Sequence, residues 1–341
     1  MFLNIIIVSW NTRELTLKCL KSVFEYMKKG VKVSERPVSE VNWKIYLVDN
    51  NSTDGTVRAV QEFLAVQSGL KTGVTDNGAV FNVTPNFSSD NLEIIINQKN
   101  VGFAKANNQA LNSVLLVGTG RDLSRQQDNY ILLLNPDTEF ISDKILAAID
   151  FMIKNKNIGI LGPQLLNSDG TLQRSCRQFP KLSDQLLIQL KFYNFWPEKF
   201  KAARQYFMLD FNHDKNMAVD QVMGAAMLIK KEVIEKIGLF DEKFWAIFEE
   251  VDFCKRAKDV GYQIYFYPAW QIIHHKEQSF KHWPSLRKQI NFNRSLYHYF
   301  KKHKPFWQFF ILWLAQPTNL FLTIIDSIAG IRKKVGKSKD L

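Results

Sequence analysis

Two adjacent carboxylates are the feature of this sequence with the most direct chemical meaning. Glu249 and Glu250 follow the apolar and aromatic run 244–248, and Asp252 comes two residues later. Clustered carboxylates repel one another, and apolar surroundings favour the neutral form, so both effects raise a pKa toward the range of a general base. The alternative is a solvated first turn of a helix, where the helix dipole favours acidic residues.

A second acidic candidate stands directly after an apolar run. Asp137 follows residues 130–134 in the segment Asn135-Pro-Asp, where a carboxylate can hold a divalent cation against a ligand phosphate. The alternative is a helix cap. His274, beside His275, is a further candidate ligand for a metal or a phosphate, although such pairs are more often structural.

Polar residues at two other positions fit nucleotide binding. Asp49 lies in Val-Asp-Asn-Asn-Ser-Thr-Asp-Gly and can accept hydrogen bonds from the edge of a nucleobase, or simply form a polar turn. Gly102, in Asn100-Val-Gly-Phe, places backbone N–H groups at the start of a helix, where they suit an anion. Either segment alone is weak evidence.

These side chains need a scaffold that brings strand ends together. The apolar runs that fit buried strands are 1–8, 44–48, 92–96 and 130–134. Helical stretches at about 12–27 and 103–116 alternate with them. The alternation predicts an α/β fold with a mostly parallel central sheet and helices on both faces. Ligands of such sheets bind beyond the carboxyl ends of the strands, where the polar residues lie.

The second half of the chain is more mixed. Its expected extended segments are 171–179, 219–230 and 262–267, and its expected helices are 249–260 and 284–302. Residues 66–91 and 117–129, rich in Gly, Ser, Asn, Asp and Thr, are expected to be surface insertions. No internal repeat is present.

The net charge of +12 over 341 residues is not evenly spread. Residues 276–341 carry 13 basic and 3 acidic residues, a net of +10, which leaves +2 for residues 1–275. Apolar residues make up 46% of the chain, which excludes a disordered polymer. The three cysteines lack metal-site spacing and suggest no disulfide framework, so a reducing compartment is expected.

The basic end of the chain is also apolar. Residues 305–315 and 320–330 are apolar stretches separated by polar residues, and each is shorter than the ~20 residues that a membrane span needs. Lys and Arg residues flank them at 301–304 and 332–339. This pattern predicts helices lying on an anionic membrane surface. The alternative is that they pack on the rest of the protein or form a dimer interface.

The order of the motifs is more specific than any one of them. Ser-Trp-Asn, Val-Asp-Asn-Asn-Ser-Thr-Asp-Gly-Thr, Asn-x-Gly-Phe-x-x-x-Asn-Asn, Leu-Asn-Pro-Asp-Thr and Glu-Glu-Val-Asp-Phe-Cys follow one another in a single series. Over about residues 3–280 the sequence resembles the inverting family 2 glycosyltransferases with a GT-A fold. It looks most similar to the rhamnosyltransferase-like branch that builds bacterial surface polysaccharides.

The resemblance implies a role for each matching residue. The implied nucleotide-sugar-binding residues are Ser9, Asn11, Asp49, Asn51, Asn100, Gly102, Asn108 and Asn135. The implied metal ligands are Asp137 and His274, for Mg²⁺ or Mn²⁺. The implied acceptor-side residues are Gly224, Ala225 and Trp245. Glu250 is the implied catalytic base, with Glu249 beside it, although the family usually has Asp at position 250; likewise Glu277 replaces a family glycine.

The resemblance also implies an organisation and a reaction. Residues 1–280 would form the catalytic domain, with a nucleotide-binding half at about 1–140 and an acceptor half at 141–280, and residues 281–341 a basic, apolar helical tail. The enzyme would move a sugar such as rhamnose, with inversion, from a UDP or dTDP sugar to a saccharide or lipid-linked acceptor. It would be cytoplasmic and peripheral at the inner face of the cell membrane.

Other functions stay open at this point. One is a GT-A-like scaffold that binds sugar nucleotides without catalysis, to which the changes at Glu250 and Glu277 point. Another is nucleic-acid binding, prompted by the basic charge. The basic residues lie beside a long apolar stretch and form no recognition motif, so no nucleic-acid partner is expected. A sugar-1-phosphate nucleotidyltransferase would need a glycine-rich, basic loop near the first strand, which is not found there. A homo-oligomer is left open.

Overall fold

The computed structural model describes residues 1–28, 41–67, 86–89, 91–117, 129–192, 199–276 and 284–329. Three features named above lie outside these ranges: most of the two expected insertions, Glu277, and the basic residues of 332–339. The first half contains β1 (Phe2–Ser9), α1 (Arg13–Lys28), β2 (Asn42–Asp49), α2 (Thr56–Gln67), β3 (Asn86–Ser89), β4 (Leu92–Ile96), α3 (Phe103–Val117) and β5 (Asn129–Leu134). The predicted strands and helices of this half are confirmed.

The second half is richer in short elements than the sequence indicates. It contains β6 (Thr138–Phe140), α4 (Ile145–Lys154), β7 (Ile158–Leu166), β8 (Leu172–Gln173), β9 (Cys176–Arg177), α5 (Leu182–Gln189), α7 (Lys201–Tyr206), β10 (Met217–Val219), β11 (Gln221–Val222), β12 (Ala226–Lys230), α8 (Lys231–Ile237), α9 (Glu249–Asp259) and β13 (Gln263–His274). The helices α10 (Ser285–His303), α11 (Phe306–Leu314) and α12 (Gln316–Ala329) follow. The strand expected over 262–267 is longer in the structure. It continues as β13 to His274, through a register shift after Tyr267.

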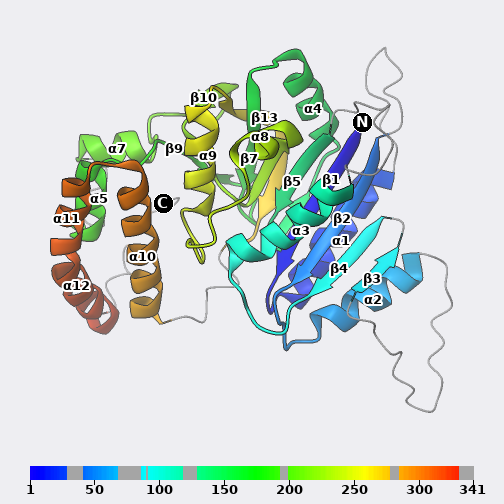
Figure 1. The fold of residues 1–341 in the computed structure, drawn as a ribbon, viewed down its shortest axis with the longest axis horizontal. Coiled ribbons are helices and arrows are strands. Elements are labelled where there is room, and N and C mark those ends of the chain that lie inside the picture. Colours follow the sequence, from blue (N-terminus) through cyan, green and yellow to red (C-terminus); the bar gives the residue numbers. More distant parts are fainter. Residues whose placement is uncertain are drawn as a thin grey trace.

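One large sheet forms the centre of the molecule (Figure 1). Its strand order is β10-β13-β7-β12-β5-β1-β2-β4-β3, with β6 beside β13 and β8 beside β7. The run β5-β1-β2-β4 is parallel, as is the pair β13 and β7. Between these groups β12 is antiparallel to both neighbours. The predicted α/β fold with helices on both faces is confirmed, and the parallel strands bring their carboxyl ends to one edge.

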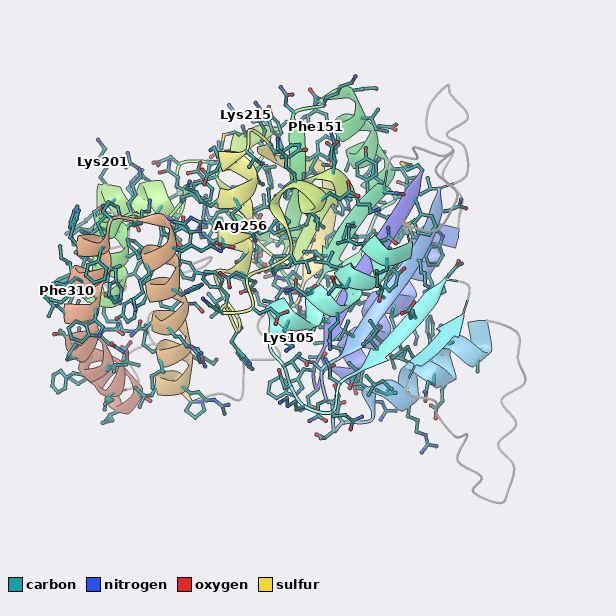
Figure 2. All side chains as sticks on the ribbon, viewed as in Figure 1. Lys105, Phe151, Lys201, Lys215, Arg256 and Phe310 are labelled. Atoms are coloured by element: carbon teal, nitrogen blue, oxygen red, sulfur yellow. The ribbon has the colours of Figure 1, made fainter. Side chains whose placement is uncertain are left out.

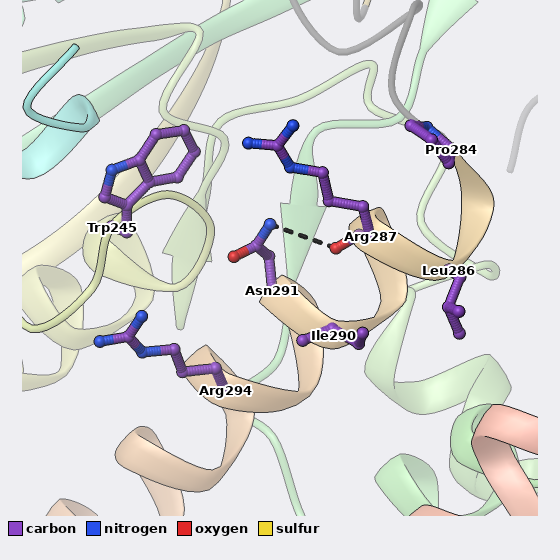
Figure 3. Close-up of a pocket in the computed structure, with 7 residues that line it drawn as sticks. All are labelled: Trp245, Pro284, Leu286, Arg287, Ile290, Asn291 and Arg294. Atoms are coloured by element: carbon purple, nitrogen blue, oxygen red, sulfur yellow. Dashed lines mark hydrogen bonds between the residues drawn. The ribbon is translucent and has the colours of Figure 1, made fainter. Parts of the chain in front are cut away.

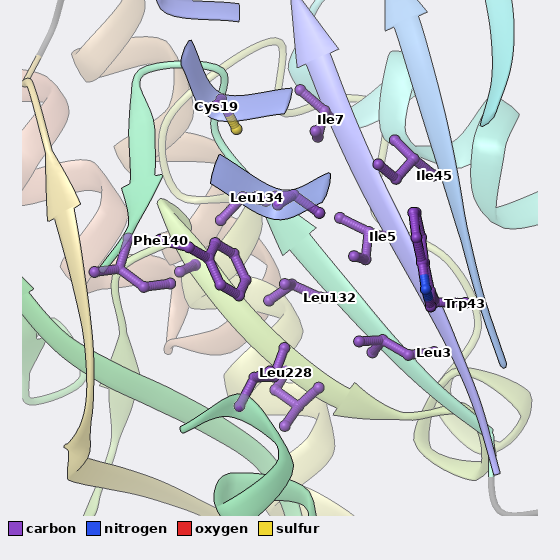
Figure 4. Close-up of a cluster of buried hydrophobic side chains, with 14 of the residues drawn as sticks. Leu3, Ile5, Ile7, Cys19, Trp43, Ile45, Leu132, Leu134, Phe140 and Leu228 are labelled. Carbon is purple, nitrogen blue, oxygen red and sulfur yellow. The ribbon is translucent and has the colours of Figure 1, made fainter. Parts of the chain in front are cut away.

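The two faces of the sheet have separate apolar cores. Because side chains alternate along a strand, Leu3, Ile5 and Ile7 of β1 face one side, where they pack with Cys19 of α1 (Figure 4). Ile6 faces the other side and packs with α3 and α9. Both faces are covered, so β1 is an almost uninterrupted apolar run. The three cysteines are buried and free.

A third cluster joins the C-terminal helices to the rest of the chain. Phe244, Phe248 and Val251 pack with Leu296 and Phe300 of α10. Figure 1 shows α10, α11 and α12 gathered with α5 and α7 at one end of the molecule. The core of this cluster therefore contains residues from both sides of position 280.

Polar contacts reinforce the attachment of α10 to α9. Asp252, which is fully buried, lies 2.8 Å from Lys302 Nζ and 2.7 Å from His303 Nε2, and 2.8 Å from Arg256 on its own helix. Although burial opposes it, these hydrogen bonds hold the pKa of Asp252 below its ordinary value. Breaking one side of such a buried pair is costly, so α10 is held firmly against α9.

Candidate active site

A pocket of about 560 Å³ lies at the carboxyl edge of the sheet. It is surrounded by the segments after β1, β2, β4, β5 and β11, the end of α5, the end of β13, the turn before α9 and one face of α10. Its lining residues are Val8, Trp10, Asn50, Asn100, Gly102, Phe103, Asn135, Pro136, Asp137, Ile188, Lys191, Met223, Trp245, Ala246, Ile247, His274, Ser285, Lys288, Gln289, Asn291 and Phe292. Six of the sequence-predicted site residues meet here: Asn100, Gly102, Asn135, Asp137, Trp245 and His274.

Asp49 lies at the end of β2, next to this pocket. One carboxylate oxygen accepts the Ser52 backbone N–H at 2.9 Å, and the other is buried with no hydrogen-bond partner in the described part of the chain. Burial raises the pKa of Asp49. A buried acceptor without a partner is costly unless a ligand satisfies it. The geometry supports the predicted contact with a nucleobase.

Ser9, Asn11 and Asn51 take part in shaping the site instead of facing the pocket. The Ser9 hydroxyl is fully buried and bonds the hydroxyls of Thr12 and Thr16 at 3.2 and 2.9 Å. Asn11 accepts the Thr53 N–H at 2.7 Å through its side chain, which ties the end of β1 to the turn after β2. Asn11 and Asn51 both have positive φ, which asparagine tolerates better than most residues.

Asn50, which sequence reasoning missed, connects two loops of the pocket. Its side-chain oxygen accepts the Val101 N–H at 3.0 Å, and its amide donates to Asn100 Oδ1 at 2.9 Å. Gly102 lies very close to Trp245. A Cβ on residue 102 would be 2.7 Å from the Trp245 carbonyl oxygen and 2.7 Å from its indole ring. Glycine is required here by space as well as by a φ of 89°.

The expected nucleotide contact by Asn108 is not supported, because Asn108 is used elsewhere. Its amide donates to the Phe240 carbonyl at 2.9 Å and to Glu242 at 3.1 Å, and its oxygen accepts the Phe240 N–H at 3.0 Å. The side chain is buried and satisfied, and it fixes α3 against the loop before α9.

Asp137 and His274 form a buried pair on the wall of the pocket. His274 Nε2 lies 3.3 Å from Asp137 Oδ1. The Gln173 amide donates to the His274 and Asn167 oxygens, so its own oxygen accepts from His274 Nδ1 at 2.7 Å. This network places a proton on Nδ1 and leaves Nε2 facing Asp137.

That arrangement fits a divalent cation held partly by a ligand. His274 Nε2 and Asp137 Oδ1 lie together on the pocket wall, and Asn135 adds a buried oxygen without a partner among the described residues. No group of three or more His, Cys, Asp or Glu side chains suited to a metal occurs in the described residues. His275 is engaged separately with Ser168 and Glu139. A metal here would need substrate phosphates to complete its coordination.

Glu249 and Glu250 begin α9 behind a turn of unusual conformation. Ile247 and Phe248 both have φ above 70°, a strained combination for residues of this size that is found mainly at functional sites. Glu250 does not line the 560 Å³ pocket. The Glu250 carboxyl carbon is 3.9 Å from the position that a Cβ on residue 224 would occupy. Gly224 directly follows Met223, which lines the pocket.

Both carboxyl groups are desolvated. Each has one buried oxygen without a hydrogen-bond partner in the described residues. Burial, and then the charge of Glu250, raise the pKa of Glu249 well above its usual value, and burial raises the pKa of Glu250. Because the two carboxyl groups are neighbours, ionising one opposes ionising the other. Ala225, also predicted on this side, accepts the Asn135 N–H at 2.9 Å through its carbonyl.

Two lysines complete the pocket and were not predicted. Lys191 is only 6% exposed and donates to Gln289 at 2.9 Å, and Lys288 stands on the facing side of α10. Their positive charges suit a phosphate-bearing ligand. They come from segments about 100 residues apart, so only the packing of α10 could reveal them.

The fold and this site define a sugar-transferring enzyme of the GT-A type. The chain belongs to the family described as glycosyl transferase family 2, whose profile matches residues 4–238. It is 25% identical over 281 residues to the N-acetylglucosaminyl-diphospho-decaprenol L-rhamnosyltransferase of Mycobacterium tuberculosis, covering 82% of this chain and 80% of that protein. It is 27% identical to the rhamnosyltransferase WbbL of Escherichia coli over 158 residues, 45% of this chain and 56% of that protein.

Solved structures confirm the fold. The mannosyltransferase PcManGT of Pyrobaculum calidifontis, determined with GDP-Man and Mn²⁺, matches 96% of this chain and 75% of its own with a TM-score of 0.51 and 16% identity. GalNAc-T7, determined with UDP, GalNAc and Mn²⁺, matches 88% of this chain and 47% of its own with a TM-score of 0.52 and 13% identity. The resemblance to family 2 glycosyltransferases is thus confirmed.

Proposed function

We propose that the protein transfers a sugar, rhamnose being the first candidate, from a UDP or dTDP sugar to a lipid-linked saccharide with inversion. The observation that carries this proposal is the pocket itself, with the Asp137–His274 pair on its wall and, beside it, a buried Asp49 oxygen that can accept from a nucleobase. Two relatives that are named rhamnosyltransferases, one of them acting on a diphospho-decaprenol, support the choice of sugar and acceptor.

The residues of this chain support a single displacement. Glu250, ionised, takes the proton of the acceptor hydroxyl as its oxygen attacks the anomeric carbon. The bond from that carbon to the diphosphate oxygen breaks, and its electron pair leaves with the nucleoside diphosphate. Lys191 and Lys288 offset the charge on the leaving group. General-base catalysis of this kind is typically worth ~10²–10⁴-fold.

Asp137 and His274 would hold a divalent cation, Mg²⁺ or Mn²⁺, with Gln173 fixing the imidazole. When bound, such a cation supplies Lewis-acid stabilisation of the leaving diphosphate. The two similar structures determined with Mn²⁺ support this choice.

Nucleotide-sugar binding is expected to stabilise the protein measurably. A ligand at about 100 times its Kd stabilises the folded state by about 2.7 kcal/mol, so UDP or dTDP sugars with Mn²⁺ should raise the Tm by several degrees. Asp49→Asn should lose most of this increase, because its one acceptor oxygen is taken by the Ser52 N–H and the amide nitrogen cannot accept the N3–H of uracil or thymine. Differential scanning fluorimetry measures both.

The matched control is Asp210→Asn, which removes an exposed carboxylate far from the pocket and should keep the full increase. If no nucleoside diphosphate sugar raises the Tm of the unaltered protein, the proposed activity is wrong. An equal increase for Asp49→Asn would show that the base binds elsewhere.

We also propose that α11 and α12 rest on an anionic membrane, as a peripheral protein at the inner face of the cell membrane. Many of their apolar side chains are exposed, including Phe306, Trp307, Phe310, Trp313, Leu314, Phe321 and Ile328. Phe310 lies at the outer edge of the molecule (Figure 2). Within the described residues no single helix is long and apolar enough to cross a bilayer; α11 and α12 together reach that length and composition, with a 41° bend between them. Lys301 and Lys304 adjoin this surface.

Flotation with liposomes tests the membrane proposal. The full chain should float with vesicles containing phosphatidylglycerol, and less so as salt is raised. Trp307→Ser/Phe310→Ser should reduce binding about tenfold or more, because each ring buries apolar area in the bilayer. Val66→Ser/Leu116→Ser, which removes equally exposed side chains elsewhere, should float normally. Unchanged flotation of the first variant would contradict the assignment.

A further inference from the structure

A second hollow adjoins the candidate active site along α10. Its volume is about 460 Å³, and it shares Trp245 and Asn291 with the first pocket. The remaining lining residues are Pro284, Leu286, Arg287, Ile290 and Arg294. The proposed donor chemistry uses none of these five, so the hollow offers space for a second substrate.

The basic side chains of the hollow act from one side of the helix. Arg287, Asn291 and Arg294 are spaced at i, i+4 and i+7 and therefore share a face. Figure 3 shows the two guanidinium groups extending from α10 toward the side on which Trp245 stands, with Asn291 between them. The Asn291 amide donates to the Arg287 carbonyl at 3.1 Å, which keeps that side chain close to the helix.

This spacing suits a diphosphate group. The Cα atoms of Arg287 and Arg294 are about 10 Å apart along the helix axis, a gap that two arginine side chains can close around one ligand. Guanidinium groups bind phosphate oxygens in pairs of hydrogen bonds, and such charge-assisted bonds are among the strongest available to a protein. Both arginines are exposed and therefore accessible.

Apolar surface accompanies the two charges. Leu286 and Ile290 are one helical turn apart and 38% and 47% exposed, and the Trp245 ring stands across from the helix. Two cations, an aromatic ring and two exposed aliphatic side chains in one hollow fit a ligand that carries an anionic group on an apolar chain. The exposed apolar faces of α11 and α12 lie on the same helical end of the molecule.

We propose that this hollow binds the diphosphate and the first isoprene units of a lipid-linked acceptor. Arg287 and Arg294 hold the diphosphate, and Leu286 and Ile290 contact the chain. Trp245, which lines both hollows, lies under the acceptor sugar where it enters the site of transfer. This assignment rests on the proposed function, because it places the second substrate of that reaction.

Isothermal titration with farnesyl diphosphate tests the hollow directly. The full chain is titrated with and without saturating UDP and Mn²⁺, which fill the donor pocket and leave the second hollow open. Binding should persist with UDP present, and Arg287→Gln/Arg294→Gln should weaken it at least tenfold. The matched control is Arg58→Gln/Arg204→Gln, which removes two arginines that do not line the hollow and should bind normally.

Two further probes identify what the hollow recognises. Farnesol, which lacks the diphosphate, should bind at least tenfold more weakly, and inorganic diphosphate should also bind more weakly. Equal binding by inorganic diphosphate would make this a free-phosphate site and overturn the assignment, and so would equal affinity of the two double variants. Thermal melting confirms that each variant folds. Because no turnover is needed, failure of UDP to bind would count against the proposed function alone.

Discussion

Replacing Glu250 by glutamine is expected to lower kcat at least 100-fold while leaving the fold and nucleotide binding intact. The amide has the same shape but cannot take a proton, so the variant loses the general base, whose usual contribution is ~10²–10⁴-fold. Because burial raises the pKa of Glu250, ionising it in the folded protein is unfavourable. Glu250→Gln should therefore melt at the same temperature as the unaltered protein or higher. Steady-state kinetics and thermal melting together separate a lost base from a lost fold.

The matched control is Glu249→Gln. Since burial and the neighbouring charge raise the pKa of Glu249 well above its usual value, an uncharged amide at this position imitates its protonated form, and most activity should remain. If Glu249→Gln were as damaging as Glu250→Gln, or if Glu249→Gln alone removed activity, the assignment of the base would be wrong.

The raised pKa of the pair also fixes the direction of the pH dependence. A carboxyl group whose pKa is raised stays protonated to higher pH than usual, and a general base works only when unprotonated. Activity should therefore decrease on acidification, with a midpoint above pH 4.5, the ordinary pKa of glutamate. The residual activity of Glu250→Gln should lack this acid limb.

The strands of the nucleotide half could be predicted because their burial on both faces produces a recognisable sequence pattern. Strands covered on both faces need continuous apolar runs, and Ile5–Ile7 or Leu132–Leu134 can hardly be placed elsewhere. β7 was missed because Gly162 and Pro163 interrupt it and usually signal a turn. Gly162 is there for space, since a Cβ would lie 2.7 Å from Val222. The second half of β13 was not predicted for the same reason, because Pro268 interrupts the strand pattern.

The site could be predicted only where its residues end a strand. Asp49 and Asp137 directly follow apolar runs, and the topology carries both to one edge. Asn108 looked equivalent within its motif, yet its position on α3 turns it toward the loop at Phe240. The role of α10 depends on tertiary packing, which no local pattern reveals. The charge of the last 66 residues was assigned chiefly to a membrane contact, whereas Lys288, one of these residues, lines the pocket.

The second large effect is expected from the Asp137–His274 pair. Mn²⁺ should strengthen binding of UDP or dTDP to the unaltered protein, because a cation held by this pair would offset the charge of the diphosphate. Asp137→Ala should abolish that strengthening and lower kcat/KM at least 100-fold. His274→Gln should reduce the effect of Mn²⁺ on binding by about 10- to 100-fold, the range typical of disturbed metal sites. Calorimetric titration of the nucleotide with and without Mn²⁺ measures this without turnover.

His275→Gln provides the comparison within the same sequence pair. His275 Nε2 lies 2.9 Å from Glu139 and its Nδ1 lies 2.7 Å from Ser168, so both ring nitrogens are engaged away from Asp137. This variant should keep the full effect of Mn²⁺ on nucleotide binding. Activity that resists EDTA and survives Asp137→Ala would remove the cation from the mechanism. The charge of the leaving diphosphate would then rest on Lys191 and Lys288, and replacing those two lysines should become the most damaging change on that side of the pocket.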